Sequence, residues 1–167
     1  MIKLRPIEPG DIDFLYEIEN DKDLWHLSSQ QQGFSKKMLL EYINEADRDI
    51  YEAKQLRLAI ENTGDKKLLG FIDLFDFDPK NKRAGVGIVI KKEERNKGNG
   101  AKVLKEIISY AFDILHLHQL YANIGENNQS SIALFEKMKF IRTGTKKDWI
   151  YKNGKFENVL FYQLIQK

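Results

Sequence analysis

The chain lacks cysteine entirely among its 167 residues. This absence excludes disulfide bonds, thiolate metal ligands and a cysteine nucleophile, and it suits a reducing compartment. Long apolar runs are missing too, since none approaches the ~18 residues that a membrane-spanning helix needs. The opening segment, residues 1–6, carries charges where a signal peptide has an apolar core. We therefore expect a cytoplasmic protein that does not bind membranes.

A strong charge of one sign is also absent. The sequence has 27 Lys and Arg against 25 Asp and Glu, a net charge of +2, which argues against general nucleic-acid binding. The three histidines show no ligand spacing with each other or with acidic residues, so we expect no metal site. No internal repeat, low-complexity tract or linker interrupts the chain. Residues 1–167 are therefore predicted to form a single domain.

Short segments with the periodicity of strands and helices follow one another along the chain. Strands are predicted at Ile2–Arg5, Gln55–Glu61, Leu68–Phe77, Val86–Ile90, Leu120–Ile124 and on both sides of the turn at Asn153 and Gly154, and helices from Pro9, after Ser35, from Lys102 and over Gln129–Lys139. Leu24, Trp25 and Phe34 lie in the connection between the first two helices, where the aromatic residues Trp25 and Phe34 form one wall of an acceptor pocket or fill the core. This order predicts an α/β protein with a mixed sheet flanked by helices.

A basic loop with two glycines joins the apolar strand Val86–Ile90 to the helix that begins near Lys102. Gly98 and Gly100 allow positive φ angles and a close approach of the main chain to a ligand. The first N–H groups of the following helix point into such a loop, where the helix dipole favours an anion. The loop is therefore predicted to hold a ligand that carries phosphate.

Three kinds of phosphate loop can be compared with this segment. A nucleoside-triphosphate loop is excluded because Gly100 is followed by Ala101 rather than by Lys. A dinucleotide fingerprint is excluded because the third glycine is missing and the segment lies in the middle of the chain. The pattern [RQ]-x-x-G-x-[GA] remains, written here as R-N-K-G-N-G over residues 95–100. An ordinary strand-to-helix loop with turn glycines also fits these letters.

The pattern resembles the acetyl-CoA pyrophosphate loop of the GNAT N-acyltransferases. A second segment, from Asn128 to Phe140, reads N-Q-S-S-I-A-L-F-E-K-M-K-F and is similar to the closing helix of that family, N-x-x-S-[IA]-x-[LVI]-[YF]-E-K-[LM]-G-F. Lys139 replaces the usual glycine, which predicts either a non-glycine residue in left-handed conformation or a shifted turn. With the element order, the resemblance covers essentially the whole chain.

The resemblance lies closest to the branch that contains ribosomal-protein alanine N-acetyltransferases and spermidine N-acetyltransferases. It implies the GNAT acyl-CoA N-acyltransferase fold, with a central, mostly antiparallel sheet. It also implies direct transfer of an acetyl group from acetyl-CoA to a primary amine in a ternary complex. The acceptor would be a polyamine-like small molecule or a protein N-terminus. Homodimerisation through the C-terminal hairpin is a further expectation taken from these relatives.

The resemblance also implies residues that hold acetyl-CoA. The main chain of one strand would bind the pantetheine arm, the loop would wrap the pyrophosphate, and the closing helix would contact the pantetheine amide and the cysteamine end. In that order, these residues are Ile88, Val89 and Ile90; Arg95, Asn96, Lys97, Gly98, Asn99, Gly100 and Ala101; Asn128; and Phe135.

The catalytic groups follow the family pattern less closely. Many relatives use a Tyr to protonate the departing thiolate, but Phe135 occupies that position and has no donor. Ser131 matches a Ser that lies near the sulfur in other relatives, so it is the predicted donor. Gly85 and Gly87 stand where relatives often carry a carboxylate, and Asp73 on the preceding strand is the predicted general base. These departures leave a second interpretation open, a non-catalytic CoA-binding GNAT domain.

Overall fold

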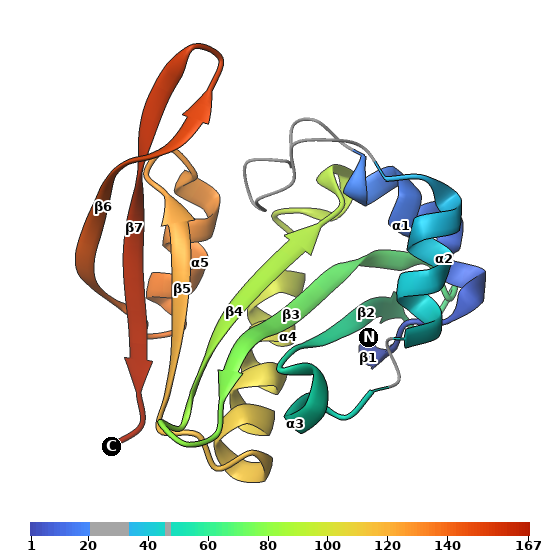
Figure 1. Cartoon of the computed structure of the whole chain (residues 1–167), viewed down its shortest axis with the longest axis horizontal. Coiled ribbons are helices and arrows are strands. Elements are labelled where there is room, and N and C mark those ends of the chain that lie inside the picture. The colour runs from blue at the N-terminus through green and yellow to red at the C-terminus, as the bar shows by residue number, and fades with distance from the viewer. Residues whose placement is uncertain (21–33, 46–47) are drawn as a thin grey trace.

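The computed structural model describes residues 1–20, 34–45 and 48–167, so Leu24 and Trp25 lie outside the described residues. One seven-stranded sheet has the order β1-β2-β3-β4-β5-β7-β6 (Figure 1). Neighbouring strands are antiparallel except β4 and β5, which are parallel. The predicted mixed, mostly antiparallel sheet is confirmed. In the part of the chain that is described, no helix is long and apolar enough to cross a membrane.

The elements follow the predicted order, with some additions. They are β1 (Ile2–Pro6), the 3-10 helix η1 (Pro9–Asp11), α1 (Ile12–Glu19), α2 (Lys36–Glu45), α3 (Ile50–Ala53), β2 (Leu56–Asn62), β3 (Leu68–Asp78), β4 (Arg83–Ile90), the 3-10 helix η3 (Lys92–Glu94), α4 (Asn99–Ser109), the π-helix η4 (Tyr110–Ile114), β5 (Gln119–Gly125), α5 (Gln129–Lys137), β6 (Ile141–Lys152) and β7 (Lys155–Ile165).

The helices form layers on the two faces of the sheet (Figure 1). Because side chains alternate along a strand, Phe71 packs with α1 and α2, while its neighbour Ile72 packs with α4. Leu15 of α1 and Leu39 of α2 are buried in the first core. The second core is larger and includes residues of α4, α5 and β5. The face covered by α1 and α2 is called the α1–α2 face below.

Three local predictions are confirmed by the geometry. The Oγ of Ser35 accepts a hydrogen bond from the N–H of Met38 (3.1 Å), as expected for the residue before α2. Asn153 and Gly154 have φ angles of 52° and 76°, as a type I′ turn between β6 and β7 requires. Lys139 has a φ of 73°, so this lysine does adopt the left-handed conformation at the end of α5.

Two local predictions need correction. Helix α4 begins at Asn99 rather than near Lys102, because its first turn is polar and carries no apolar period. The four-residue helix α3, capped by Asp49, was not predicted, since so short a segment shows no helical period. These corrections leave the sheet order unchanged.

Candidate active site

The parallel pairing of β4 with β5 is short. It joins only the residues from Arg83 to Gly85 to those from Gln119 to Tyr121. Beyond this point β4 continues to Ile90 and β5 continues to Gly125, and the two strands diverge (Figure 1). Among the described residues, the edge of β4 that faces β5 therefore has no strand partner after Gly85. We call this space between the diverging strands the β4–β5 gap.

Two residues of β4 direct their main chain into the β4–β5 gap. The N–H of Lys91 donates to the carbonyl of Leu69 (2.7 Å). Residues that bond to the partner strand alternate in an antiparallel pair, so the register directs the main chain of Val89 toward β3. The main chain of Ile88 and Ile90 then faces the opposite way. The N–H groups of both residues and the carbonyl of Ile88 can receive a ligand that lies along β4, whereas the carbonyl of Ile90 accepts a hydrogen bond from Arg95.

The loop after β4 brings the residues of the phosphate pattern together. The Nε of Arg95 donates to the carbonyl of Ile90 (2.8 Å), which ties the loop to the end of β4. Asn96 and Gly98 have φ angles of 62° and 81°. Gly98 is the residue before α4 and supplies no side-chain cap. The first N–H groups of α4 have no partner within the helix, so they are available to an anion.

Gly100 does not have the positive φ angle that was predicted for it. It lies in the first turn of α4. A Cβ atom at this position would lie 2.9 Å from Cδ2 of Leu134 in α5. Gly100 therefore allows α4 and α5 to pack closely, whereas Gly98 provides the left-handed conformation of the loop.

The predicted residues of the closing helix lie at the start and in the middle of α5. The Oδ1 of Asn128 accepts a hydrogen bond from the N–H of Ser131 (3.2 Å), so Asn128 caps the helix. Ser131 lies in the first turn and is half-buried. Phe135 is 3% exposed and packs edge-on against Phe140 with ring centroids 5.0 Å apart. Phe135 is thus part of the core.

Asp73 is held by an arginine that the sequence patterns did not single out. Nε of Arg57 donates to Oδ1 of Asp73 (2.6 Å) and Nη2 donates to Oδ2 (3.1 Å). Nη1 of the same guanidinium contacts Glu19 at the end of α1. Burial opposes the charge on Arg57, but the two carboxylates outweigh burial and raise its pKa above the ordinary value. Arg57 thus bridges Glu19 and Asp73.

No sequence pattern indicated this cluster, because its members are far apart in the chain. Arg57 lies opposite Asp73 in the β2–β3 pair, and only the register shows this. The guanidinium also lies over the rings of Tyr42 and Phe71, with its carbon 5.8 and 5.7 Å from their centroids.

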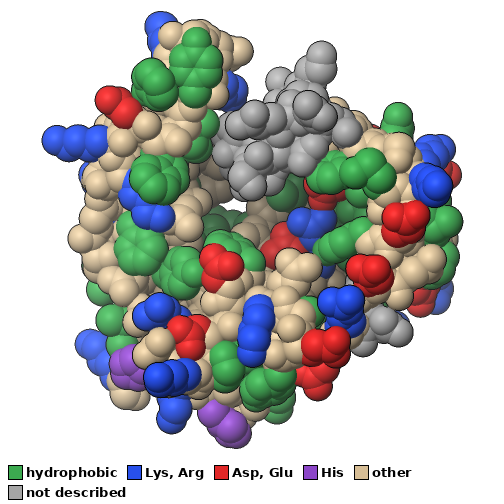
Figure 2. Space-filling model, viewed as in Figure 1, with side chains coloured by type: hydrophobic (Ala, Val, Ile, Leu, Met, Phe, Trp, Pro, Cys, Tyr) green, Lys and Arg blue, Asp and Glu red, His purple; other side chains and the backbone are tan. Residues whose placement is uncertain are grey.

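The surface of the molecule is hollowed between the β6–β7 side and the α1–α2 side, in the view of Figure 2. We call this depression the hollow.

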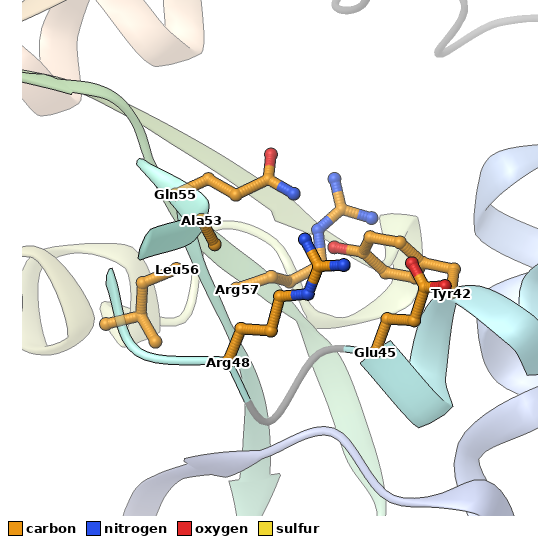
Figure 3. Close-up of a pocket in the computed structure, with 7 residues that line it drawn as sticks. All are labelled: Tyr42, Glu45, Arg48, Ala53, Gln55, Leu56 and Arg57. Atoms are coloured by element: carbon orange, nitrogen blue, oxygen red, sulfur yellow. The ribbon is translucent and has the colours of Figure 1, made fainter. Parts of the chain in front are cut away.

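A small cavity lies beside the cluster, between α2, α3 and β2. Its volume is about 100 Å³, and its lining residues are Tyr42, Glu45, Arg48, Ala53, Gln55, Leu56 and Arg57 (Figure 3). Ligand pockets usually measure roughly 300–1,000 Å³, so a coenzyme does not fit here. The β4–β5 gap is the better candidate. In the described part of the chain, no three His, Asp or Glu side chains come together as metal ligands.

The fold and the loop agree with a family comparison. A model of the acetyltransferase (GNAT) domain matches residues 2–141. The chain therefore belongs to the GNAT acetyltransferase family, as the sequence motifs predicted.

Named relatives fall in the two predicted groups. The spermidine N(1)-acetyltransferase of Vibrio cholerae is 24% identical over 165 residues, which cover 99% of this chain and 93% of that protein. The protein of Bacillus subtilis named "Putative ribosomal N-acetyltransferase YdaF" is 26% identical over 170 residues, which cover 99% of this chain and 92% of that protein. Both similarities extend over nearly the whole chain.

Solved structures show the same fold. The crystal structure of the Vibrio cholerae spermidine N-acetyltransferase in complex with CoA and spermine has a TM-score of 0.89 with 24% identity, over 99% of this chain and 95% of that chain. The predicted GNAT fold is confirmed.

Proposed function

We propose that this protein transfers an acetyl group from acetyl-CoA to a primary amine, by direct attack in a ternary complex. One observation carries the proposal: the β4–β5 gap has open main-chain groups along one side and leads to an uncapped helix N-terminus. Family membership supports it, because the matching domain is an acetyltransferase domain. The similar Vibrio cholerae enzyme binds CoA, which fits the same interpretation.

Acetyl-CoA would bind along β4. The pantetheine arm would pair with the main chain of Ile88 and Ile90 as an additional strand would. The main chain of Val89 is directed to β3, so we propose that only Ile88 and Ile90 bind the pantetheine arm. The diphosphate would accept hydrogen bonds from the N–H groups between Gly98 and Ala101.

The side chains around the loop and in α5 complete this proposed site. Arg95 positions the loop through the carbonyl of Ile90 (2.8 Å), Asn96 and Lys97 follow in this loop, and Asn99 begins α4. Asn128 uses Oδ1 as a cap, which leaves its amide N–H groups for the pantetheine. Phe135 supports the cysteamine end from the core.

The reaction sets three demands, and the chain offers a group for each. An amine with a free pKa near 10 must lose a proton, and Asp73 is the proposed acceptor. The oxyanion of the tetrahedral intermediate needs a fixed donor, worth roughly 3–4 kcal/mol in similar acyl transfers. The N–H of Ile88 is the proposed donor. When the C–S bond breaks, the thiolate would take a proton from the hydroxyl of Ser131.

The acceptor is proposed to be a cationic amine, either a polyamine-like molecule or a protein N-terminus. The named relatives include both kinds of acetyltransferase. The carboxylate of Asp73 on the α1–α2 face supplies a negative field for such a cation. A polyamine carries several ammonium groups, so it gains more from this negative field than a peptide does.

CoA binding and CoA release test the function together. Calorimetry should show binding of CoA that desulfo-CoA displaces and adenosine nucleotides displace only weakly. Release of free thiol should then appear with at least one amine from a panel of spermidine, spermine, aminoglycosides and N-terminal peptides. CoA binding without turnover on any amine would instead favour the non-catalytic CoA-binding domain.

We also propose that copies of the chain associate through the β6–β7 hairpin. Trp149, Tyr151 and Phe156 on this hairpin are 63%, 68% and 62% exposed. Large exposed aromatic side chains in one segment are typical of an interface. A dodecameric structure of the Vibrio cholerae enzyme supports self-association in the family. Light scattering should show an oligomer that Tyr151→Ser dissociates, and a monomeric wild-type protein would contradict the proposal.

A further inference from the structure

Two rows of residues cross the sheet on the α1–α2 face. Residues opposite each other in neighbouring strands share a face, so Arg57, Asp73 and Gly87 form one row. Phe75 pairs with Gly85, and Gly85 pairs with Tyr121 across the β4–β5 junction. These three residues form the next row on the same face. The α1–α2 face of the sheet thus contains two glycines of β4.

The two glycines have different surroundings. A Cβ atom at Gly85 would lie 2.3 Å from Cε2 of Phe75, so the phenyl ring already fills that space. At Gly87 the closest atom is Cε1 of Phe75 at 3.8 Å, an ordinary contact distance. Packing therefore requires glycine at residue 85 but not at residue 87. Among the described residues, the floor over Gly87 is open beside the ring of Phe75, in the same row as Asp73.

The open floor borders the β4–β5 gap. Gly87 precedes Ile88, whose main chain faces the gap. The ring of Phe75 contacts Tyr121 edge-on, with centroids 5.9 Å apart, and Tyr121 is the last residue of β5 that pairs with β4. A group that enters over Gly87 therefore reaches the point where the two strands separate.

The chemistry around this opening suits an ammonium group on an unbranched carbon chain. Each oxygen of Asp73 has one hydrogen bond from Arg57 and keeps a lone pair for another donor. An aromatic ring attracts a cation at its face and packs against methylene groups.

We propose that Gly87 determines acceptor specificity: the space above it admits an unhindered primary amine from the hollow to the acetyl group and excludes amines branched beside the nitrogen. This inference rests on the proposed function and narrows its acceptor to polyamine-like amines, because the α-amino group of a protein N-terminus other than glycine is on a branched carbon. Gly87 acts through the space that it leaves, so a side chain at this position would block the acceptor while leaving the coenzyme site intact.

The test is a series of variants with larger side chains, Gly87→Ala and Gly87→Val, with Gly144→Ala as the matched control. Gly144 lies in β6, an edge strand that β5 and β7 separate from β4. A Cβ atom at Gly144 would meet nothing within 4 Å. We expect Gly87→Val to raise the acceptor KM by about tenfold or more, the usual effect of methyl-sized steric differences. The dissociation constant for CoA should stay within about twofold, and the control should match the wild type.

Three outcomes decide the matter. The inference is supported if the wild type prefers straight-chain to branched amines, and if Gly87→Val loses affinity for the acceptor while its CoA binding is unchanged. Normal acceptor kinetics in Gly87→Val, or a loss confined to CoA binding, overturns the inference alone. If wild-type protein binds CoA but acetylates no amine, the proposed function is wrong and the inference falls with it. Thermal unfolding of each variant shows whether a loss reflects misfolding.

Discussion

Arg57 restricts what Asp73 can do, because both oxygens of this carboxylate already accept a hydrogen bond from the guanidinium. This pairing fixes the direction of the carboxylate beside the open floor at Gly87. A proton from the amine would have to reach one of the remaining lone pairs, directly or through water. Asp73 can therefore act as the general base only through the lone pairs that Arg57 does not use.

Asp73→Asn tests this assignment. If Asp73 accepts the proton, kcat/KM near pH 7 should fall about 100-fold, within the usual range for general base catalysis. The deficit should shrink as the pH approaches the amine pKa near 10, because the amine then loses its proton to solvent. A pH–rate profile measures both effects, with Asp76→Asn as control, since Asp76 is exposed on the same strand. A deficit that stays constant with pH would indicate a positioning role only.

Ser131→Ala tests the proton donor. We expect kcat to fall only about tenfold, the lower end of acid catalysis, because a thiolate with a pKa near 8 can also leave into water. Ser130→Ala is a matched control, since the Oγ of Ser130 bonds to Oδ1 of Asn128 instead (3.2 Å). Steady-state kinetics at saturating substrates give the comparison. Unchanged kcat and an unchanged pH profile would dismiss Ser131 as the donor.

At the scale of single elements, periodicity and turn residues predicted most of the fold. The strands predicted at Leu68–Phe77 and Val86–Ile90 from their apolar composition are present, and the second begins three residues earlier, at Arg83. Contacts between distant residues were not recognisable. The pairing of Arg57 with Asp73 depends on strand register, and the packing reason for Gly100 depends on Leu134 in another helix. Local patterns carry no information about either neighbour.

The end of α5 offers a stabilising substitution. Lys139 has a φ of 73°, and a left-handed conformation costs a non-glycine residue about 1 kcal/mol. Lys139→Gly removes this cost and should raise the melting temperature by roughly 2–4 °C in a protein of this size. Lys137→Gly, within α5, is the control and should lower it. A lower melting temperature for Lys139→Gly, measured by calorimetry, would be inconsistent with strain at this position.

At the scale of the whole molecule, one arginine connects the first strand to two other parts of the chain. Nη1 and Nη2 of Arg5 donate to the two oxygens of Asp11 (both 2.8 Å), and Nε donates to Glu61 (2.7 Å). Burial raises the pKa of Asp11, but the hydrogen bonds from Arg5 outweigh burial and hold that pKa below its ordinary value. The hydrogen bond from Arg5 likewise lowers the pKa of Glu61.

These shifts predict how stability depends on pH. A carboxyl whose pKa is lower in the folded state contributes stability above its unfolded pKa and loses it as the pH falls through the folded value. Arg5→Met should therefore be less stable at pH 7 by about 3 kcal/mol, as for a broken buried ion pair. The difference should narrow below about pH 4.5, where the carboxyls take up protons.

Urea denaturation at pH 7, 5 and 3 measures this difference. Lys36→Met is the control, because Lys36 forms an exposed pair with Asp13 and should change stability little at any pH. A constant offset between Arg5→Met and the wild type across the pH range would mean that packing, not charge, explains the contribution of Arg5.

The alternation along β4 has a consequence for amide hydrogen exchange. The amide of Val89 is directed to β3, so it should exchange slowly whether or not a ligand is present. The amides of Ile88 and Ile90 face the β4–β5 gap, where no neighbouring strand protects them, and they should exchange rapidly in the free protein. Added coenzyme should slow exchange at every second residue of this strand. Slower exchange at alternate amides would show that the coenzyme binds the main chain of β4, a contact that side-chain substitutions cannot test.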